Sequence, residues 1–281
     1  GWYRNPVRVA VSASDIPPGY VPQLRCVLDP AVAPTSFLDL PPGDCPYASP
    51  GLLVTANGHH HFYAMGRDND GNDSPLVSKS FDIDASPPTV TCDGTGPASF
   101  TIGAPDGILS ATVTDSLSGP DPDPANGQTT LDASHLATAG NRTATVIGKD
   151  LAGNQTSVSC AYQVGYDVDV VAPVAGASFK NGATVAVTFR LRDDAGNTIS
   201  DAAAAQLAGG KRSPCFITAL FDDVAQKVCP TYAAATDVFT LNVKTPKGRS
   251  VIGTHDIAIQ IKAPDGTGIV NLVRIPIILT T

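Results

Sequence analysis

Alternation of apolar and polar residues is the feature of this sequence that most limits its fold. Apolar side chains take every second position in several runs: Val7, Val9 and Val11; Leu109, Ala111 and Val113; Val185, Val187 and Phe189; Phe239, Leu241 and Val243; and Ile257, Ile259 and Ile261. A period of two places these side chains on one face of a β-strand. One stretch, Asp201 to Leu207, is predicted to be a helix, with Ser200 as a candidate N-cap and Gly209 and Gly210 as stops. We therefore expect an all-β fold with one short helix.

Proline-marked stretches divide the chain into segments. Gly and Pro number 26 and 24 of 281 residues, which indicates many turns between short strands. Two stretches follow alternating runs and should act as linkers because proline interrupts strand pairing, namely residues 84–88 and 166–173. The resulting domains are 1–86, 87–166 and 167–281, each near the size of an immunoglobulin-like sandwich. The prediction is three tandem antiparallel immunoglobulin-like β-sandwiches.

A repeated motif supports this division. Asp-x-x-Gly-Asn occurs once in each segment, at Asp68, Gly71 and Asn72; at Asp150, Gly153 and Asn154; and at Asp193, Gly196 and Asn197. In a tight turn Gly and Asn tolerate positive φ, and Asp can bond the amides of the turn. We interpret the three copies as structural hairpin turns.

Six cysteines are spread evenly along the chain, without a Cys-x-x-Cys pair that would indicate zinc. An even number in this pattern is typical of an oxidising compartment. Six cysteines allow 15 connectivities. The segmentation selects one consecutive pair per segment: Cys26–Cys45, Cys92–Cys160 and Cys215–Cys229.

Charge and hydropathy argue against two classes of partner. The net charge of −8 gives no basic surface for nucleic acid. There is no apolar run of about 18 residues that would span a membrane. The first residues lack the layout of a signal peptide, so we expect a mature or excised part of an exported protein.

Two regions of the sequence contain residue types that bind metal ions. His59 and His61 alternate onto one strand face, where two imidazoles could share an ion, but ordinary strand sequence around His60 is the favoured interpretation. The acidic loops offer looser calcium sites, with ligands drawn from Asp68, Asp70 and Asp73 or from Asp115, Asp121 and Asp123. The first loop is not an EF-hand because its Gly comes too early and no Glu follows. We predict no cofactor, and expect calcium to be dispensable for folding.

Catalytic patterns are missing from the sequence. It contains no Gly-x-Ser-x-Gly elbow and no phosphate-binding loop. His135 and His255 look isolated, and the acidic pairs at 193–194 and 222–223 are interpreted as solvated loops. Asn141 and Asn154 begin glycosylation sequons, a motif that is frequent by chance. The sequence therefore favours a protein that is not an enzyme.

Longer stretches resemble known families. The first segment, with Gly58-His59-His60-His61-Phe62-Tyr63-Ala64 before Asp68-Asn69-Asp70-Gly71-Asn72, resembles bacterial Ig-like repeats of exported proteins. The second, with 146–154 and the closing Cys160-Ala161-Tyr162-Gln163-Val164, is similar to HYR-like Ig modules. The third, 172–191, is similar to the PxKF domain, a C-terminal module, although only Phe189 of the naming motif is kept.

These resemblances imply an extracellular or cell-surface location and a non-catalytic structural or interaction role, as a stalk, spacer or fibre subunit. The partner would be an unknown protein or polysaccharide, and self-assembly into a fibre is compatible with the fold. The alternative is a carbohydrate- or protein-binding accessory region of a secreted hydrolase. With short linkers, we expect the segments to follow one another as a semi-rigid rod.

Overall fold

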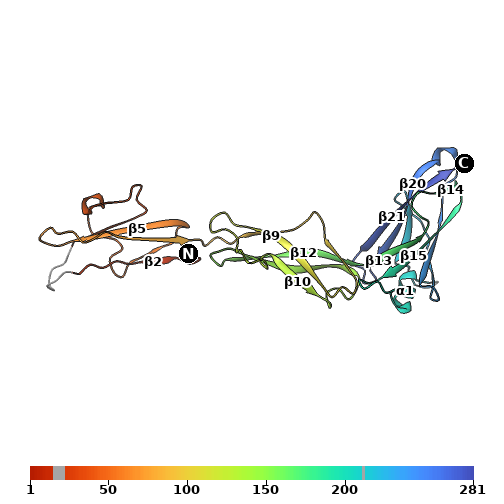
Figure 1. The fold of residues 1–281 in the computed structure, drawn as a ribbon, viewed down its shortest axis with the longest axis horizontal. Helices are drawn as coiled ribbons and strands as arrows, with labels where there is room; N and C mark the ends of the chain where they lie inside the picture. The colour runs from red at the N-terminus through yellow and green to blue at the C-terminus, as the bar shows by residue number, and fades with distance from the viewer. Residues whose placement is uncertain (15–22, 211–212) are drawn as a thin grey trace. The chain divides into compact units, whose positions relative to one another are not determined.

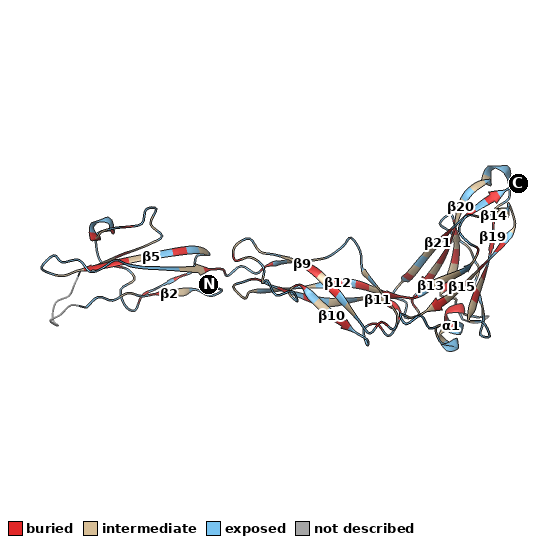
Figure 2. Cartoon of the chain, in the orientation of Figure 1, coloured by how far each residue is buried: buried red, intermediate tan, exposed pale blue. Residues whose placement is uncertain are grey.

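Strands dominate the computed structural model, which describes residues 1–14, 23–210 and 213–281 (Figure 1). The fold is all-β, with paired sheets in the manner of immunoglobulin-like sandwiches, as the alternating runs predicted. Figure 2 shows the reason: buried and exposed residues alternate along the strands, so one face of each sheet is apolar.

In the first segment, two sheets enclose a small core. One sheet has the order β1-β6-β5-β3 and the other pairs β2 with β4. Their bounds are β1 Trp2–Tyr3, β2 Val7–Val9, β3 Gln23–Leu28, β4 Leu52–Val54, β5 Gly58–Arg67 and β6 Val77–Ile83. The core consists of Val9, Cys26, Cys45, Val54, Phe62, Ala64 and Ile83. The 3-10 helix η1, Phe37–Asp39, lies in the long connection between β3 and β4.

The middle segment has two three-stranded sheets, with orders β10-β9-β7 and β11-β12-β8. Their bounds are β7 Thr89–Cys92, β8 Ala98–Thr101, β9 Asp106–Thr114, β10 Gln128–Asp132, β11 Gly140–Lys149 and β12 Gln155–Gly165. Alternate residues of β12 are buried, namely Cys160, Tyr162 and Val164.

The last segment carries the largest core. Its sheets have the orders β13-β15-β19-β18 and β14-β21-β20-β16-β17. The bounds are β13 Asp167–Ala172, β14 Ala177–Lys180, β15 Thr184–Arg192, β16 Ile217–Phe221, β17 Val224–Ala225, β18 Thr231–Ala233, β19 Val238–Lys244, β20 Gly253–Lys262 and β21 Ile269–Thr280. Phe189 and Phe239 stack in this core with ring centroids 5.3 Å apart.

The predicted helix is confirmed. Helix α1 spans Asp201–Ala208, the Ser200 side chain accepts a hydrogen bond from the Ala203 amide, and Gly209 ends the helix at φ 70°. The 3-10 helix η2 spans Arg249–Val251. Within the described residues no helix is long and apolar enough to cross a bilayer.

The structure adds one detail to the expected sandwiches and corrects one expected linker. The sheets are not wholly antiparallel, because an early edge strand pairs in parallel with the last strand of its segment in β1–β6, β8–β12 and β14–β21. The stretch 166–173 is not a linker, because Asp167–Ala172 forms β13, paired antiparallel with β15. Its alternation of Asp and Val suits a half-buried strand, and only Pro173 lies beyond it.

Packing divides the chain into two units. Residues 1–91, 111–127 and 147–158 form the first, and residues 92–110, 128–146 and 159–281 form the second. Strands β7, β9, β11 and β12 contribute residues to both. The division into domains 1–86, 87–166 and 167–281 therefore stays a prediction.

Candidate functional site

The three Asp-x-x-Gly-Asn turns have one hydrogen-bond pattern. The Asp amide donates to the Asn carbonyl, and the Gly amide donates to the Asp carbonyl. The Asn amide and side-chain nitrogen both donate to the Asp carboxylate, at 2.8 and 2.7 Å in the first copy, 2.8 and 2.8 Å in the second, and 2.8 and 3.2 Å in the third. The aspartate therefore closes each turn from inside.

Two details of these turns differ from expectation. Only the glycines have positive φ, 90°, 88° and 81°. The asparagines do not have positive φ. Each of them instead binds the Asp carboxylate through its backbone amide and its side-chain nitrogen. The first two copies join neighbouring strands β5–β6 and β11–β12, but the third leaves β15 and leads to α1 after one bridge between Arg192 and Thr198. The third copy is therefore not a two-strand hairpin.

The second turn contacts the end of the first segment. The side-chain nitrogen of Asn154 donates to the carbonyls of Asp84, at 2.8 Å, and Ser86, at 3.3 Å. Arg4 donates to the carbonyl of Gly153 at 3.3 Å. We call this set of contacts the first junction. It clamps the chain where it passes from β6 to β7.

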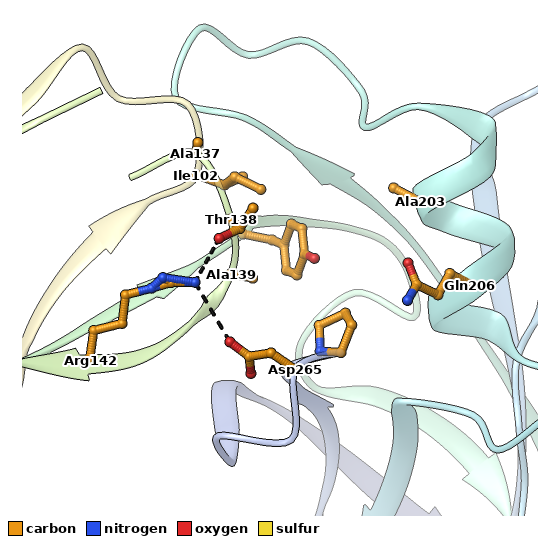
Figure 3. Close-up of a pocket in the computed structure, with 10 residues that line it drawn as sticks. Ile102, Ala137, Thr138, Ala139, Arg142, Ala203, Gln206 and Asp265 are labelled. Carbon is orange, nitrogen blue, oxygen red and sulfur yellow. Dashed lines mark hydrogen bonds and ion pairs between the residues drawn. The ribbon is translucent and has the colours of Figure 1, made fainter. Parts of the chain in front are cut away.

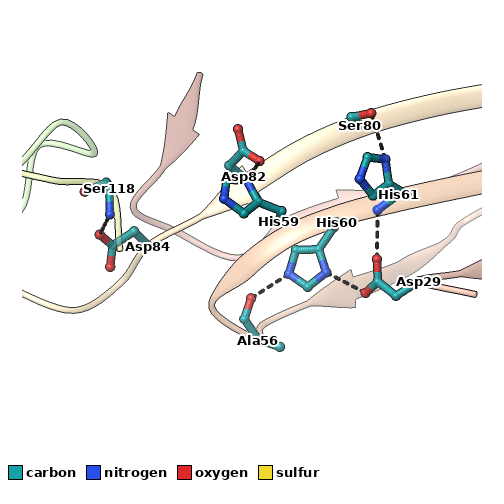
Figure 4. Close-up of polar contacts among 9 residues, drawn as sticks. All are labelled: Asp29, Ala56, His59, His60, His61, Ser80, Asp82, Asp84 and Ser118. Carbon is teal, nitrogen blue, oxygen red and sulfur yellow. Dashed lines mark hydrogen bonds and ion pairs between the residues drawn. The ribbon is translucent and has the colours of Figure 1, made fainter. Parts of the chain in front are cut away.

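Asp84 is the centre of the first junction. It is fully buried, and its amide donates to the Tyr3 carbonyl. Its carboxylate accepts from the Ser86 amide at 2.9 Å and from the Ser118 amide at 3.1 Å, and the Ser118 contact is seen in Figure 4. A buried carboxylate needs such donors because water cannot reach it. The side chain thus fixes both the linker and the loop that follows β9.

Two further carboxylates lie beside it. Ligand oxygens of Asp84, Asp115 and Asp150 are all within 4.8 Å of one another. Burial raises the pKa of Asp115, but the amides of Gly119, Leu117 and Ser118 outweigh it, so that pKa is lowered overall. In the part of the chain that the structure describes, no Lys, Arg or His is ion-paired with any of the three. Carboxylate oxygens are the ligands that a hard divalent cation prefers, so these residues are the ones that could hold such an ion.

Amide side chains also clamp the passage from the second segment to the third. The Tyr166 amide donates to Asn271 Oδ1 at 2.9 Å, and Asn271 Nδ2 donates back to the Tyr166 carbonyl at 2.8 Å. Asn141 Nδ2 and Gln163 Nε2 both donate to the Ile269 carbonyl, at 3.2 and 2.6 Å. We call these contacts the second junction. Four hydrogen bonds, two of them a reciprocal pair between Tyr166 and Asn271, hold the ends of β11 and β12 to the start of β21.

The third Asp-x-x-Gly-Asn turn faces this region. The Asp194 amide donates to the Ile102 carbonyl at 2.9 Å. A Cβ built on Gly103 would lie 3.4 Å from the Cβ of Asp193, so the two backbones are in close approach. The second and third turns are thus each placed against the segment that precedes them.

A cavity of about 510 Å³ lies beside the second junction (Figure 3). Arg142 donates to Thr138 Oγ1 at 2.6 Å and lies 3.6 Å from Asp265 Oδ2. Burial, with the charge of Asp265, raises the pKa of the Tyr166 phenol to about 12, so the phenol is neutral at physiological pH. The remaining lining residues are Ile102, Ala137, Ala139, Ala203, Gln206 and Pro264. The cavity contains no apposed nucleophile and base.

The three histidines of the run bond different partners. His59 bonds Asp82 at 2.6 Å and packs against Trp2, whereas Nδ1 of His61 is hydrogen-bonded to the Ser80 hydroxyl at 3.1 Å. His60 lies on the other face and is buried (Figure 4). Each ring thus has its own partner in the structure.

The proposed acidic ligand sets are not brought together as sets. In the first loop Asp68 closes the turn and Asp73 pairs with Arg67, while Asp70 stays exposed. In the second, Asp121 and Asp123 accept amides of their own loop. Asp115 instead joins Asp84 and Asp150.

Cysteine pairing follows the segments. The structure contains the disulfides Cys26–Cys45, Cys92–Cys160 and Cys215–Cys229. Both sequon asparagines are engaged through the nitrogen that a glycan would occupy, Asn154 with Asp84 and Asn141 with Thr267. The folded chain therefore offers neither nitrogen freely.

The structure shows several side-chain contacts that no sequence pattern indicated. His135 is bonded to Asp132 and His255 to Asp222, so neither is isolated. Asp223 pairs with Arg274, so the 222–223 pair is not simply a solvated loop. No sequence pattern indicated Asp84 or Asn271, because their partners Asn154 and Tyr166 lie 70 and 105 positions away in the sequence. The only available hint was that Asp84 is the first residue of the proline-marked stretch 84–88.

Comparisons with known proteins yield structures alone. No family model and no curated protein sequence matches the chain. The N-terminal eight Ig domains of Down Syndrome Cell Adhesion Molecule isoform 1.30.30 align over 99% of this chain and 39% of that chain, at 11% identity and a TM-score of 0.30. Fibronectin(III)-like modules of CbhA from Clostridium thermocellum align over 68% and 94%, at 15% identity and a TM-score of 0.27. The chain spans less than half of the first of these proteins, and such low TM-scores carry no argument about function.

Proposed function

We propose that this chain is a non-catalytic, extracellular structural module that acts as a spacer in a bacterial surface or secreted protein. The observation that carries the proposal is the pair of clamped junctions. At each junction, a side-chain amide is hydrogen-bonded to backbone atoms of the neighbouring segment. Asn154 donates to the carbonyls of Asp84 and Ser86, and Asn271 bonds both the amide and the carbonyl of Tyr166. A spacer needs its joints to resist bending, and hydrogen bonds across each joint supply that resistance.

The finer assignment is part of the same proposal. Its Ig-like segments would be HYR-like repeats followed by a PxKF-like domain, and its partner a protein or polysaccharide, with fibre assembly as one mode of use. Three disulfides support an oxidising, extracellular setting.

The proposal predicts that each junction behaves as one rigid body in solution. Residual dipolar couplings from residues on the two sides of a junction should fit one alignment tensor. Asn154→Ala removes the side-chain bonds to Asp84 and Ser86 at the first junction, and Asn271→Ala removes the two bonds with Tyr166 at the second. Each variant should require separate tensors across its own junction while leaving the other unchanged.

Asn72→Ala is the matched control. Asn72 closes the same turn through Asp68, but its amide donates to no residue outside the turn in the described chain. It should destabilise its turn and leave both junctions rigid. Separate tensors in the wild-type chain would overturn the spacer proposal. Retention of the chain on insoluble polysaccharide would instead favour the accessory binding region, with the cavity beside Arg142 as its first candidate site.

A further inference from the structure

Two histidines in separate sheets have the same surroundings. His60 Nδ1 lies 2.7 Å from Asp29 Oδ2, and its Nε2 lies 2.8 Å from the Ala56 carbonyl. His255 Nδ1 lies 2.6 Å from Asp222 Oδ2, and its Nε2 lies 2.8 Å from the Val251 carbonyl. In both cases the carbonyl belongs to the residue four positions earlier. The same set of contacts is thus formed around both histidines.

Packing holds each ring in place. His60 stacks on Phe81 with centroids 5.1 Å apart, and His255 stacks on Phe221 at 5.2 Å. The two aspartates share a further feature: Asp29 and Asp222 have positive φ, 51° and 47°. Each of these carboxylates also accepts the amide of the residue after the histidine, at 2.8 Å for His61 and 3.0 Å for Asp256.

The partners of the rings decide their protonation state. A carbonyl oxygen can only accept, so Nε2 must carry a hydrogen, and an ionised carboxylate likewise requires a hydrogen on Nδ1. Only the imidazolium satisfies both. A neutral ring would direct a lone pair at one of the two oxygens and lose that bond.

The charged groups near each ring reinforce this conclusion. Around His60 they are Asp29 and, on β6, Asp82; burial lowers its pKa, but the bonds to Asp29 and Ala56 and both carboxylate charges raise it above 6.5 overall. At His255 the bond to Asp222 raises the pKa most, burial lowers it, and the Val251 carbonyl and the Asp222 charge add to the rise. Burial raises the pKa of Asp222, but the Asp256 amide and His255 lower it overall. The other charged groups of this region are Lys244 and Lys247, which line a cavity with Asp222, the ion pair of Asp223 with Arg274, and Arg249 in η2.

We propose that His60 and His255 are two pH-sensitive locks, closed when the ring is protonated and weakened when it loses its proton. His60 joins Asp29 to Ala56 and so closes the base of the long connection that contains η1, Cys45 and β4. His255 joins the turn after β16 to the end of η2. Protons are thus the ligand that fastens these two connections.

The sign of the pH effect follows from linkage. A histidine whose pKa is higher in the folded than in the unfolded chain stabilises the fold fully below the unfolded value of about 6.5, and this stability is lost as pH rises through the folded pKa. The locks should therefore be tight in mildly acidic surroundings and weaken on the alkaline side of 6.5.

Nuclear magnetic resonance of the whole chain tests the locks directly. Titration of the imidazole signals should give pKa values above 6.5 for His60 and His255, with both ring nitrogens protonated below that point. Protection factors of the His61 and Asp256 amides, which donate to the two carboxylates, should fall as each ring deprotonates. Values at or below 6.5 for both rings would overturn the proposal even if every variant failed to fold.

Variants supply the second measurement. In His60→Gln and His255→Gln the ring is replaced by an amide that does not titrate, so the fall in melting temperature above pH 6.5 should be smaller than in the wild-type chain, and smallest in the double variant. His61→Gln is the matched control, because this neighbouring ring bonds Ser80 and no carboxylate. It should keep the wild-type pH dependence. An unchanged pH dependence in a folded double variant would contradict the proposal.

Discussion

At the scale of single residues, the clearest packing arrangement surrounds Phe37. Its ring is 1% exposed, and the guanidinium carbons of Arg25 and Arg67 lie 4.5 and 4.3 Å from its centroid. Arg67 is also paired with Asp73. The aromatic ring thus anchors η1 on the sheet through cation–π contacts and apolar burial, in a region with few other large buried side chains.

Phe37→Ala should therefore destabilise the first segment by about 3 kcal/mol, the usual cost of removing a buried Phe. The neighbouring Leu38, 72% exposed, is the control, and Leu38→Ala should cost less than about 0.5 kcal/mol. Urea unfolding followed by fluorescence of Trp2, the single tryptophan, reports on this segment. Equal costs for the two variants would show that η1 contributes no core.

At the scale of elements, the Asp-x-x-Gly-Asn turn recurs because one carboxylate satisfies several amides that a tight reversal leaves exposed. Its glycine is the position with a conformational requirement. Gly196 has φ 81°, and no atom lies within 4 Å of a Cβ built there. A substitution at Gly196 would therefore measure backbone strain without a steric clash.

Gly196→Ala should cost about 1 kcal/mol, because left-handed backbone is unfavourable for a residue with a Cβ. Gly96→Ala is the control: its Cβ also meets no atom, but its φ is not in the positive range. That variant should be neutral or slightly stabilising. Chemical denaturation followed by circular dichroism compares the two, and a cost as large at Gly96 would rule out the conformational explanation.

The ends of three elements bring Asp84, Asp115 and Asp150 together, which gives the expected calcium independence a specific test. Protein N–H groups already donate to both oxygens of Asp84, to both of Asp150 and to one of Asp115, which leaves the cluster short of the six or more free oxygen ligands of a calcium site. We expect EDTA to leave the melting temperature nearly unchanged. A fall of many degrees that is absent from an Asp115→Asn variant would show that these carboxylates hold a cation on which the fold depends.

At the scale of the whole chain, covalent bonds and cores share the stabilisation unequally. The disulfide Cys92–Cys160 closes 68 residues, whereas Cys215–Cys229 closes 14 within the segment that has the largest core. In the chain-entropy account, the longer loop gains more from closure.

Replacing Cys92 and Cys160 by Ala should therefore cost about 4 kcal/mol, and replacing Cys215 and Cys229 about 3 kcal/mol. Calorimetry of the two double variants measures the difference, and peptide mapping under non-reducing conditions checks the pairing itself. A bond between cysteines of different segments would contradict the proposed domain boundaries.

The sequence alone determined the fold class and its repeated parts. Alternation in runs such as 185–191 predicts strands because a pleated backbone turns successive side chains to opposite faces. Ser200 and Gly209 predict the ends of α1, and the three aspartate turns are readable, because each of these signals acts within a few residues. The proline-based prediction was wrong at 166–173, because the expected linker contains strand β13, which pairs with β15.

The tertiary structure alone decided the junctions and the locks. Asp84 meets Asn154, Tyr166 meets Asn271, and His60 meets Asp29, at sequence separations of 70, 105 and 31 residues. Nothing local marks such partners, because a hydrogen bond depends on distance in space, and strand register sets that distance. A one-residue slip of β5 would turn His60 away from the core and His59 into it, so the site depends on register while the fold class depends only on pattern.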